Sequence, residues 1–234
     1  MPDVGETWLV EKGISLVATF PLCELPEPLG NSLHREGVEF DGYRSAVLLG
    51  NAGTNLWPAI EKSGISGQDP IDDHSRAVAF EYADRWLGDA DPLLLYPTDR
   101  YRPQLQLWSQ AARWYHRSPL GMGIHPEFGL WQACRALLLV DVDLPLRREP
   151  PSVSPCVDCV SPCVGACPAG VLSVGDWPDM FGCLRYRVAD ISRCADRCVA
   201  RLACPVAAEH RYPLAQIQHH YRDPQDTLNR HFPG

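Results

Sequence analysis

Cysteine is concentrated in one part of this chain of 234 residues, because eight of its ten cysteines lie between residues 156 and 204. Thiols placed by chance would be spread along the whole sequence, so this density needs a chemical reason. A disulfide scaffold and a metal or iron-sulfur site are the two explanations. The first residues, Met1 to Glu6, carry no basic segment and lead into no apolar run of signal-peptide length. We therefore expect a cytoplasmic protein whose clustered cysteines bind metal.

The first four clustered cysteines form a CxxCxxxCxxxCP pattern that begins at Cys156 and ends at Cys167-Pro168. The bacterial ferredoxin pattern is CxxCxxCxxxCP, and its fourth cysteine binds the other cluster of a pair. A second set begins at Cys183 and also ends in a Cys-Pro pair, Cys204-Pro205. A tetrahedral zinc site would instead use four thiolates in two CxxC pairs. Eight thiolates with two Cys-Pro ends favour two 4Fe-4S clusters, and zinc remains the alternative.

The ferredoxin pattern also predicts which cysteines share a cluster, since the fourth ligands of the two sets are exchanged. One cluster would be held by Cys156, Cys159, Cys163 and Cys204. The other would be held by Cys167, Cys183, Cys194 and Cys198. The gaps before Cys163 and before Cys204 are longer than those of the ferredoxin pattern. The assignment of individual cysteines to each cluster is therefore less constrained than the number of clusters.

The composition bears on the kinds of partner that the chain can have. Its net charge of -8 and sequence pI of about 5.4 argue against a broad basic surface for nucleic acid. Hydrophobic residues make up 45% of the sequence, which is enough for a packed core. No apolar run approaches the roughly 20 residues that a membrane helix needs. We therefore expect a soluble protein without a membrane partner, and a nucleic-acid partner is not favoured.

Apolar and amphipathic segments alternate before residue 150. Asp69-Pro70 predicts the start of a helix, with Asp69 as the cap and Pro70 in the first helical position, and Gly88 predicts its end. A second helix is expected over residues 105–116. Strands are expected at residues 14–20, 46–49, 93–96 and 136–140. Strands that alternate with helices predict a layered α/β or α+β domain.

The run from Leu146 to Pro155 breaks this alternation, because charged residues are followed there by several prolines. We place a domain boundary near residue 150. The predicted domains are residues 1–150 and residues 151–234, and the second, smaller domain is expected to be ferredoxin-like and to carry both clusters.

Some isolated residues have an ordinary structural interpretation. His74 lies on the apolar stripe of the first predicted helix and is expected to be a structural histidine. Cys23 and Cys134 stand apart from the cysteine cluster and are expected to be small buried side chains. The sequence offers no paired carboxylates, activated serine or Cys-His pair that would identify a catalytic residue, and we assign none.

The segment Gly123-Ile124-His125-Pro126-Glu127-Phe128-Gly129-Leu130-Trp131 resembles the HPxFGGW stretch of the CblC-type cobalamin-processing proteins, with Leu130 in place of the second glycine. Asp69-Pro70-Ile71-Asp72 similarly resembles the DPVD element of that family. The resemblance covers roughly residues 10 to 145. It implies a nitroreductase-like (CblC-like) α/β sandwich that binds cobalamin and removes its upper ligand. The implied cobalamin contacts are His125, Phe128, Gly129 and Trp131.

Epoxyqueuosine reductases and reductive dehalogenases are similar in plan, since they join a related cobalamin domain to a two-cluster ferredoxin domain. Cys183-Leu184-Arg185-Tyr186 resembles the lone cysteine and tyrosine that precede the last cysteine set of epoxyqueuosine reductase. The GLGWIGK stretch of that enzyme is not found, and His125-Pro126-Glu127-Phe128-Gly129 stands where it would be expected. We therefore rank cobalamin processing above tRNA modification.

These resemblances imply an iron-sulfur oxidoreductase that binds cobalamin and reductively removes its upper ligand, by decyanation or dealkylation. Electrons from an external donor would pass through the two 4Fe-4S clusters, a type of centre whose potentials span about -700 to +450 mV. The cysteine-rich C-terminal region departs from the CblC pattern and favours electron delivery over thiol-dependent dealkylation. The alternatives are a cobalamin-dependent reductase of another substrate, similar to epoxyqueuosine reductase, and a ferredoxin-like electron carrier.

Overall fold

The computed structural model describes residues 4–231, which divide into two compact units. The first unit contains the residues up to Tyr115 together with Gln132–Ser152, and the second contains His116–Trp131 and the residues from Val153 onward. The segment that carries the HPEFG motif therefore belongs to the same unit as the clustered cysteines. This grouping differs from a single division near residue 150, and the functions assigned to the two predicted domains stay predictions.

The first unit is built on a four-stranded antiparallel sheet with the strand order β1-β2-β6-β3. Its strands are β1 (Leu16–Pro21), β2 (Ser45–Ala52), β3 (Leu93–Tyr96) and β6 (Gln132–Val140). Each strand overlaps one of the four that the apolar runs predict. Every residue of β2 is buried, because this strand lies between β1 and β6 with helices on both faces of the sheet. The predicted α+β fold class is confirmed.

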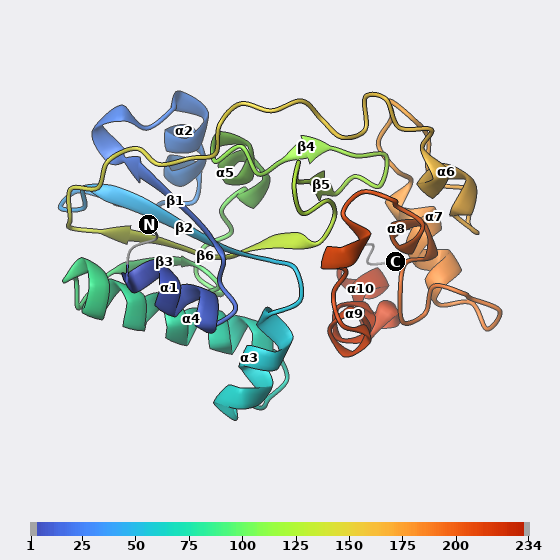
Figure 1. Cartoon of the computed structure of the whole chain (residues 1–234), viewed down its shortest axis with the longest axis horizontal. Helices are drawn as coiled ribbons and strands as arrows, with labels where there is room; N and C mark the ends of the chain where they lie inside the picture. Colours follow the sequence, from blue (N-terminus) through green and yellow to red (C-terminus); the bar gives the residue numbers. More distant parts are fainter. Residues whose placement is uncertain (1–3, 232–234) are drawn as a thin grey trace. The chain divides into compact units, whose positions relative to one another are not determined.

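Figure 1 shows how helices cover the two faces of this sheet. One face carries α1 (Val4–Glu11) and α4 (Pro70–Tyr82), and the other carries α2 (Glu27–Arg35) and α5 (Leu105–Ala111). On the α4 side, α3 (Leu56–Ser63) joins the packing. The apolar core of that face includes Leu9, Leu49, Ile60, Val78 and Leu138.

The opposite face is closed by aromatic packing. The rings of Phe20 on β1 and Trp108 on α5 meet edge to face, with their centroids 5.5 Å apart, and both side chains are buried. Such pairs add to the free energy that burial alone contributes. The expected helix over residues 105–116 ends earlier, at Ala111. Arg113 adopts a left-handed conformation with φ of 63°, and this turn places Trp114 in the core.

Helix α4 begins where the sequence predicts. Pro70 occupies the first turn, and the acidic Asp72 and Asp73 suit the positive end of the helix dipole. The expectation that Asp69 caps the helix is wrong in one respect, since its side chain makes no capping hydrogen bond. After Tyr82 the helix continues as a π-helical turn over Ala83–Leu87 and stops at Gly88, as predicted.

Two further expectations concern single residues of the first unit. His74 is a structural histidine, as expected, because its Nε2 lies 2.9 Å from the carbonyl oxygen of Lys12. Cys23 is exposed and not buried, because it lies in a short 3-10 helix, η1 (Leu22–Glu24), that has no buried residue. The general tendency of free cysteines to be buried therefore does not hold for Cys23 in this surface turn.

The segment after β6 stays with the first unit as far as Ser152. Arg147 pairs with Thr19 on the edge strand β1 through two backbone hydrogen bonds of 3.0 Å and 2.9 Å. The hydroxyl of Thr19 also bonds to the carbonyl oxygen of Pro145 at 2.5 Å. The first part of the predicted linker is thus held against the sheet.

The second unit contains little strand structure. A short hairpin joins β4 (His116–Arg117) to β5 (Gly123–Ile124). The rest of the unit is built from short helices and loops (Figure 1). Its helices are α6 (Pro162–Ala166), α7 (Met180–Arg187), α8 (Val199–Leu202), η3 (Ala208–His210), α9 (Leu214–Tyr221) and α10 (Pro224–His231).

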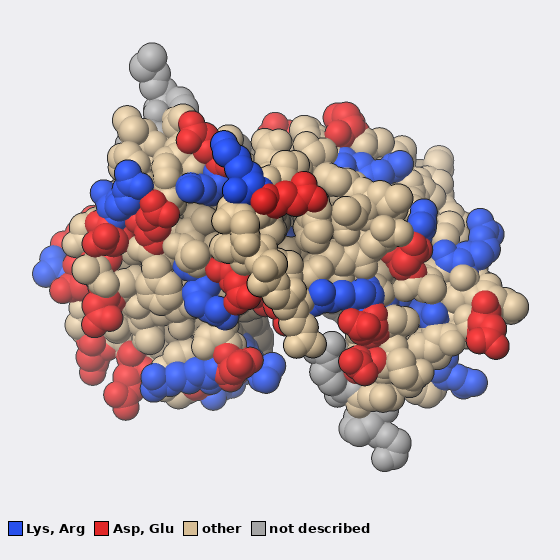
Figure 2. Space-filling model, turned by 90° about the horizontal axis from the view of Figure 1, so that it is seen from below, with Lys and Arg blue, Asp and Glu red and all other residues tan. Residues whose placement is uncertain are grey.

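Acidic and basic side chains are interspersed on the face that Figure 2 shows. Among the exposed ion pairs of the first unit, Arg44 pairs with Asp141 and with Asp143. Over residues 4–231, no helix has both the length and the apolar character that spanning a membrane requires.

Two glycines with positive φ provide a matched test of packing in the first unit. A Cβ on Gly13 (φ of 80°) would lie 2.5 Å from the Cα of Leu56, whereas one on Gly37 (φ of 67°) would meet nothing within 4 Å. We expect Gly37→Ala to lower the free energy of unfolding by about 1 kcal/mol, from backbone strain alone. Gly13→Ala should cost about 3 kcal/mol, because steric overlap adds to that strain. Urea unfolding measures the free energy of unfolding of both variants. Equal losses in the two would contradict the close packing of Gly13 against Leu56.

Candidate functional site

Four of the clustered cysteines come together around α6 and the end of α8. Cys163 lies in α6 and interacts electrostatically with Cys156, Cys159 and Cys204. Cys204 interacts in turn with Cys159. The structure therefore groups the same four thiols that the ferredoxin pattern assigns to one cluster. We call them the first quartet.

The other four cysteines form a second quartet. Cys167 is the C-cap of α6, Cys183 lies in α7, and Cys198 is the N-cap of α8. Cys183 interacts electrostatically with Cys167, Cys194 and Cys198. Cys163 within α6 and its C-cap Cys167 belong to different quartets, as do Cys198 and Cys204 on either side of α8. The binding of a cluster by either quartet stays a prediction.

The chemistry of these donors is compatible with iron-sulfur clusters. All ten cysteines are free thiols. In the part of the chain that the structure describes, no three His, Cys, Asp or Glu side chains converge closely enough to hold one metal ion. A 4Fe-4S cluster takes four thiolates around a body of several atoms, so its ligands stand farther apart than those of one ion. Eight free thiols in two quartets supply the number of thiolates that two such clusters take.

Burial makes these sites unfavourable for unpaired thiolates. It raises the pKa of Cys163, Cys204 and Cys198, and neighbouring thiols raise each pKa further. For Cys183 burial is again the main cause, and its pKa reaches about 11. Metal binding requires the deprotonated form, so thiolates at these positions would need the positive charge of a bound metal.

The segment from His116 to Trp131 packs against both quartets. Leu120, Ile124 and Leu130 form an apolar core with Cys163, Ala200 and Cys204. Cys156, Cys167 and Cys198 pack against the same core. This apolar surrounding keeps water away from one side of the thiols, and the hydrophobic shell of a metal site influences its redox potential.

Gly129 is required by the backbone that faces it. Its φ is 56°, and a Cβ at this position would lie 2.5 Å from the carbonyl oxygen of Val206. The loop that begins at His125 closes with two backbone hydrogen bonds between His125 and Gly129, of 2.8 Å and 3.0 Å. Glycine therefore allows the HPEFG loop to lie against the segment that follows Cys204.

The ring of His125 is buried, with 4% of its surface exposed. Its Nδ1 accepts backbone N–H groups from Glu127 at 3.1 Å and Phe128 at 3.3 Å. The proton of the neutral ring is therefore on Nε2, which is buried and has no hydrogen-bond partner among residues 4–231. Burial, with a contribution from His116, lowers the pKa of His125 to about 4. At neutral pH this side chain is an uncharged hydrogen-bond donor.

Phe128 and Trp131 have aromatic partners within the second unit. The ring of Phe128 lies 5.0 Å from that of His125 and 4.9 Å from that of His210. Trp131 is fully buried, with the ring of Tyr212 at 5.5 Å and the guanidinium of Arg201 at 4.5 Å. Trp131 therefore holds the end of the HPEFG segment, and its contact with a cofactor stays a prediction.

Three residues beside the second quartet were not expected from the sequence. Arg187 and Arg201 are buried, and the hydroxyl of Tyr221 forms a hydrogen bond with the thiol of Cys198. Arginine and tyrosine are common surface residues, and no spacing rule relates these three to the cysteines. The only available signal was their position within or soon after the cysteine-rich segment.

The first unit contains a separate buried polar group. The Nε of Arg135 donates to the Oδ1 of Asn51 at 2.5 Å, and the Nη2 of Arg135 is buried without a hydrogen-bond partner in the described range. Burial, followed by the charge of Asp72, raises the pKa of Tyr96 to about 12. Cys134 is a half-buried residue and not a fully buried one. Burial of its thiol raises the pKa of Cys134 to about 11.

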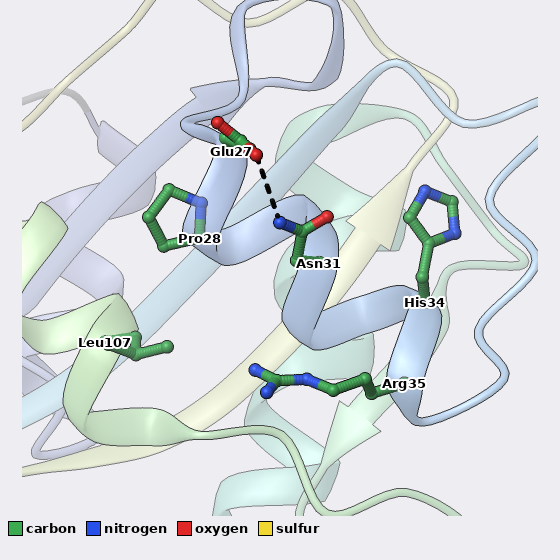
Figure 3. Close-up of a pocket in the computed structure, with 6 residues that line it drawn as sticks. All are labelled: Glu27, Pro28, Asn31, His34, Arg35 and Leu107. Carbon is green, nitrogen blue, oxygen red and sulfur yellow. Dashed lines mark hydrogen bonds between the residues drawn. The ribbon is translucent and has the colours of Figure 1, made fainter.

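A surface pocket of about 750 Å³ lies on the first unit between α2 and α5 (Figure 3). It is lined by Glu27, Pro28, Asn31, His34, Arg35 and Leu107. Glu27 and Asn31 are joined by a hydrogen bond of 3.4 Å along α2. The lining contains no cysteine and no residue of the HPEFG segment, so this pocket is not part of the site that the sequence predicts.

Comparison with known proteins identifies the fold. No protein-family model matches the sequence, and no curated protein matches it. Solved structures do match. The CblC protein from C. elegans, a B12-trafficking protein homologous to human MMACHC, aligns with a TM-score of 0.55 and 13% identity. That alignment covers 97% of this chain and 91% of the other.

Epoxyqueuosine reductases match at similar levels. A complex of this enzyme with a tRNA-Tyr epoxyqueuosine-modified stem loop aligns with a TM-score of 0.54 and 13% identity, covering 94% of this chain and 68% of that chain. The enzyme from Streptococcus thermophilus gives a TM-score of 0.52 and 14% identity, with coverages of 89% and 66%. At these identities the similarity establishes the shared α+β fold.

The buried neutral ring of His125 predicts a pH dependence of stability. Above pH 6.5 the ring is neutral in the folded and unfolded states, but below it the unfolded state binds a proton that the folded state excludes, until the pH approaches 4. The free energy of unfolding should therefore fall as the pH falls through this window. In the His125→Gln variant, the fall in the free energy of unfolding between about pH 7.5 and about pH 5.5 should be smaller than in the parent by about 1 kcal/mol.

Urea unfolding at the two pH values measures this difference. Substitution of the exposed His34 by Gln is the matched control and should leave the pH dependence of the parent unchanged. An unchanged pH dependence in His125→Gln would show that the ring is not held neutral by burial.

Proposed function

We propose that this protein is an iron-sulfur oxidoreductase that binds a cobalamin-type corrinoid and reductively removes its upper ligand. The observation that carries the proposal is the packing of two crossed thiol quartets with the HPEFG segment in one compact unit. The fold shared with a CblC protein and with epoxyqueuosine reductases supports it. The second unit would be the ferredoxin-like part of the chain.

The eight thiolates would hold two 4Fe-4S clusters, one in each quartet. When bound, these clusters supply a path for single electrons at low potential. The chain itself contributes the crossed ligand geometry of α6 and α8 and the apolar core around Leu120, Ile124 and Leu130. That core excludes water from one side of the thiols.

His125, Phe128, Gly129 and Trp131 remain the proposed residues for corrinoid binding. In this proposal His125 is the direct polar contact, because its Nε2–H has no partner in the described part of the chain. The rim of a corrin ring carries amide groups that accept such a hydrogen bond. Gly129 and Trp131 act behind His125 by fixing the loop against Val206 and Arg201.

The reaction balances with one external electron for each cyanide released. A low-potential one-electron donor supplies the electron, and cobalt of the cyanocorrinoid substrate is reduced from Co(III) to Co(II). The cobalt-carbon bond breaks, and cyanide leaves with the bonding pair. No residue needs to act as a nucleophile in this step, which agrees with the absence of an activated nucleophile from the sequence analysis.

A second candidate is a cobalamin-dependent reductase of another substrate, comparable to epoxyqueuosine reductase. The structural similarity to that enzyme over 94% of this chain supports it. In this alternative the corrinoid is regenerated in each turnover and an organic molecule is reduced. Release of the corrinoid's own upper ligand, with no organic product formed, separates the first candidate from the second.

Metal analysis tests the two clusters. Anaerobically purified whole chain should contain about eight irons and about eight sulfides per molecule. Cys204→Ala removes a ligand of the first quartet and Cys194→Ala one of the second, so each should retain about four irons. Cys23→Ala and Cys134→Ala, which change thiols outside both quartets, should retain about eight. A parent value near four, or an equal loss in the two control variants, would contradict the assignment.

Corrinoid binding and turnover test the activity. The cluster-loaded chain is mixed anaerobically with cyanocobalamin and reduced methyl viologen, and absorbance follows the change from Co(III) to Co(II). We expect release of one cyanide per corrinoid at a rate above that of the reductant alone. His125→Phe should weaken corrinoid binding about fivefold, which corresponds to the loss of one net hydrogen bond of about 1 kcal/mol.

The control for turnover is Cys194→Ala, which should bind the corrinoid but release cyanide no faster than the reductant alone. A parent protein that contains its iron yet binds no corrinoid would overturn the proposal in favour of an electron carrier. Reduction of an organic substrate with unchanged corrinoid would favour the second candidate.

A further inference from the structure

Two buried arginines lie beside the second quartet without a carboxylate partner. Arg187 is 9% exposed and Arg201 is 7% exposed. Arg187 donates its Nε to the carbonyl oxygen of Cys194 at 3.3 Å and its Nη2 to that of Tyr221 at 2.8 Å. Arg201 donates its Nη2 to the carbonyl oxygen of Leu130 at 2.6 Å. Among residues 4–231, neither guanidinium forms an ion pair with Asp or Glu.

A buried cation without a counter-charge is strongly unfavourable, because its hydration is lost and carbonyl oxygens compensate only in part. The second quartet lies close enough to supply that counter-charge, since Arg187 interacts electrostatically with Cys183. Four neutral thiols carry no charge, whereas a cluster ligated by four thiolates is anionic. Arg187 is therefore placed to neutralise a ligated second quartet, and Arg201 reaches the same quartet through its backbone N–H.

Two hydrogen bonds reach the sulfur of Cys198 directly. The backbone N–H of Arg201 lies 3.3 Å from it, and the hydroxyl of Tyr221 bonds to it from the end of α9. The guanidinium of Arg187 lies 4.8 Å from the centre of the Tyr221 ring and holds the backbone of the same residue. Arg187 thus fixes the position from which Tyr221 bonds to the sulfur.

The first quartet has different neighbours. Ser154 bonds to the thiol of Cys156, and Arg211, which is partly exposed, acts on Cys204. Neither Arg187 nor Tyr221 is among the groups that act on these thiols. Any effect of the arginine and tyrosine group is therefore specific to one quartet.

We propose that Tyr221, Arg187 and Arg201 are positioning residues that raise the reduction potential of the cluster in the second quartet. Reduction adds one electron from the external donor and forms no bond, so it increases the negative charge on the cluster and its sulfurs. Hydrogen bonds to a sulfur and adjacent cations stabilise that added charge, and such bonds are a known determinant of cluster potential. This inference rests on the two clusters of the proposed function.

Anaerobic redox titration followed by electron paramagnetic resonance tests the inference on the whole cluster-loaded chain. Tyr221→Phe keeps the ring and removes the hydroxyl. We expect it to lower the equilibrium constant for reduction of one cluster about tenfold, which for one electron is a shift of about 59 mV to more negative potential. Arg187→Gln should shift the same cluster in the same direction, and Arg187→Lys, which keeps the charge, should shift it less.

The matched control is Tyr186→Phe on α7, whose hydroxyl accepts the backbone N–H of Arg193 at 3.5 Å. It should leave both potentials unchanged. In a Cys204→Ala background, which retains only the second quartet, Tyr221→Phe should still shift the remaining signal. In a Cys194→Ala background, which retains only the first, it should shift nothing.

The outcomes separate this inference from the proposed function. A parent with fewer than about eight irons would show that the two-cluster assignment has failed. Suppose that the parent and the Tyr221→Phe variant both contain about eight irons and have the same two cluster potentials. That result would overturn this inference and leave the proposed function intact. A shift in the Cys194→Ala background would overturn it as well, because the effect would then belong to the first quartet.

Discussion

Charge balance among buried groups is the constraint on which the second unit depends. Burial raises the pKa of the quartet thiols, and two guanidinium groups lie buried beside them without carboxylates in the described residues. Neutral thiols would leave those cations uncompensated, whereas the iron-bound thiolates of the proposed clusters would supply the opposite charge. The free energy of metal binding is then partly the free energy of folding this unit.

The crossed arrangement of the quartets follows from how short the helices are. Helix α6 has five residues and α8 has four, and helices of this length are not stable in isolation. Cysteines at both ends of each helix belong to different quartets, so ligation at two sites would fix each helix. Loss of one cluster would free one end of α6 and of α8, while the remaining cluster would still hold the other end.

Local patterns in the sequence predict much of this architecture, and contacts between distant segments account for what they miss. The spacing from Cys156 to Cys204 predicts the two groups of thiols, because ligand spacing is a local property. Apolar runs predict the four strands for the same reason. The position of Arg201 beside Leu130, in contrast, depends on two segments that are far apart in the sequence and share no pattern. The early end of α5 depends on the left-handed turn at Arg113, which no local rule requires.

The HPEFG segment illustrates why such a contact matters for function. Sequence order places His125 before β6 and so with the first unit, but the fit of Gly129 against Val206 attaches the loop to the segment that follows Cys204. Arg201 strengthens this attachment, since it bonds both to Leu130 and, through its backbone, to the sulfur of Cys198. The proposed corrinoid contact and the proposed electron path are therefore fixed within one compact unit. The distance from His125 to the thiols is set by packing inside the second unit, and the proposed electron transfer depends on that distance.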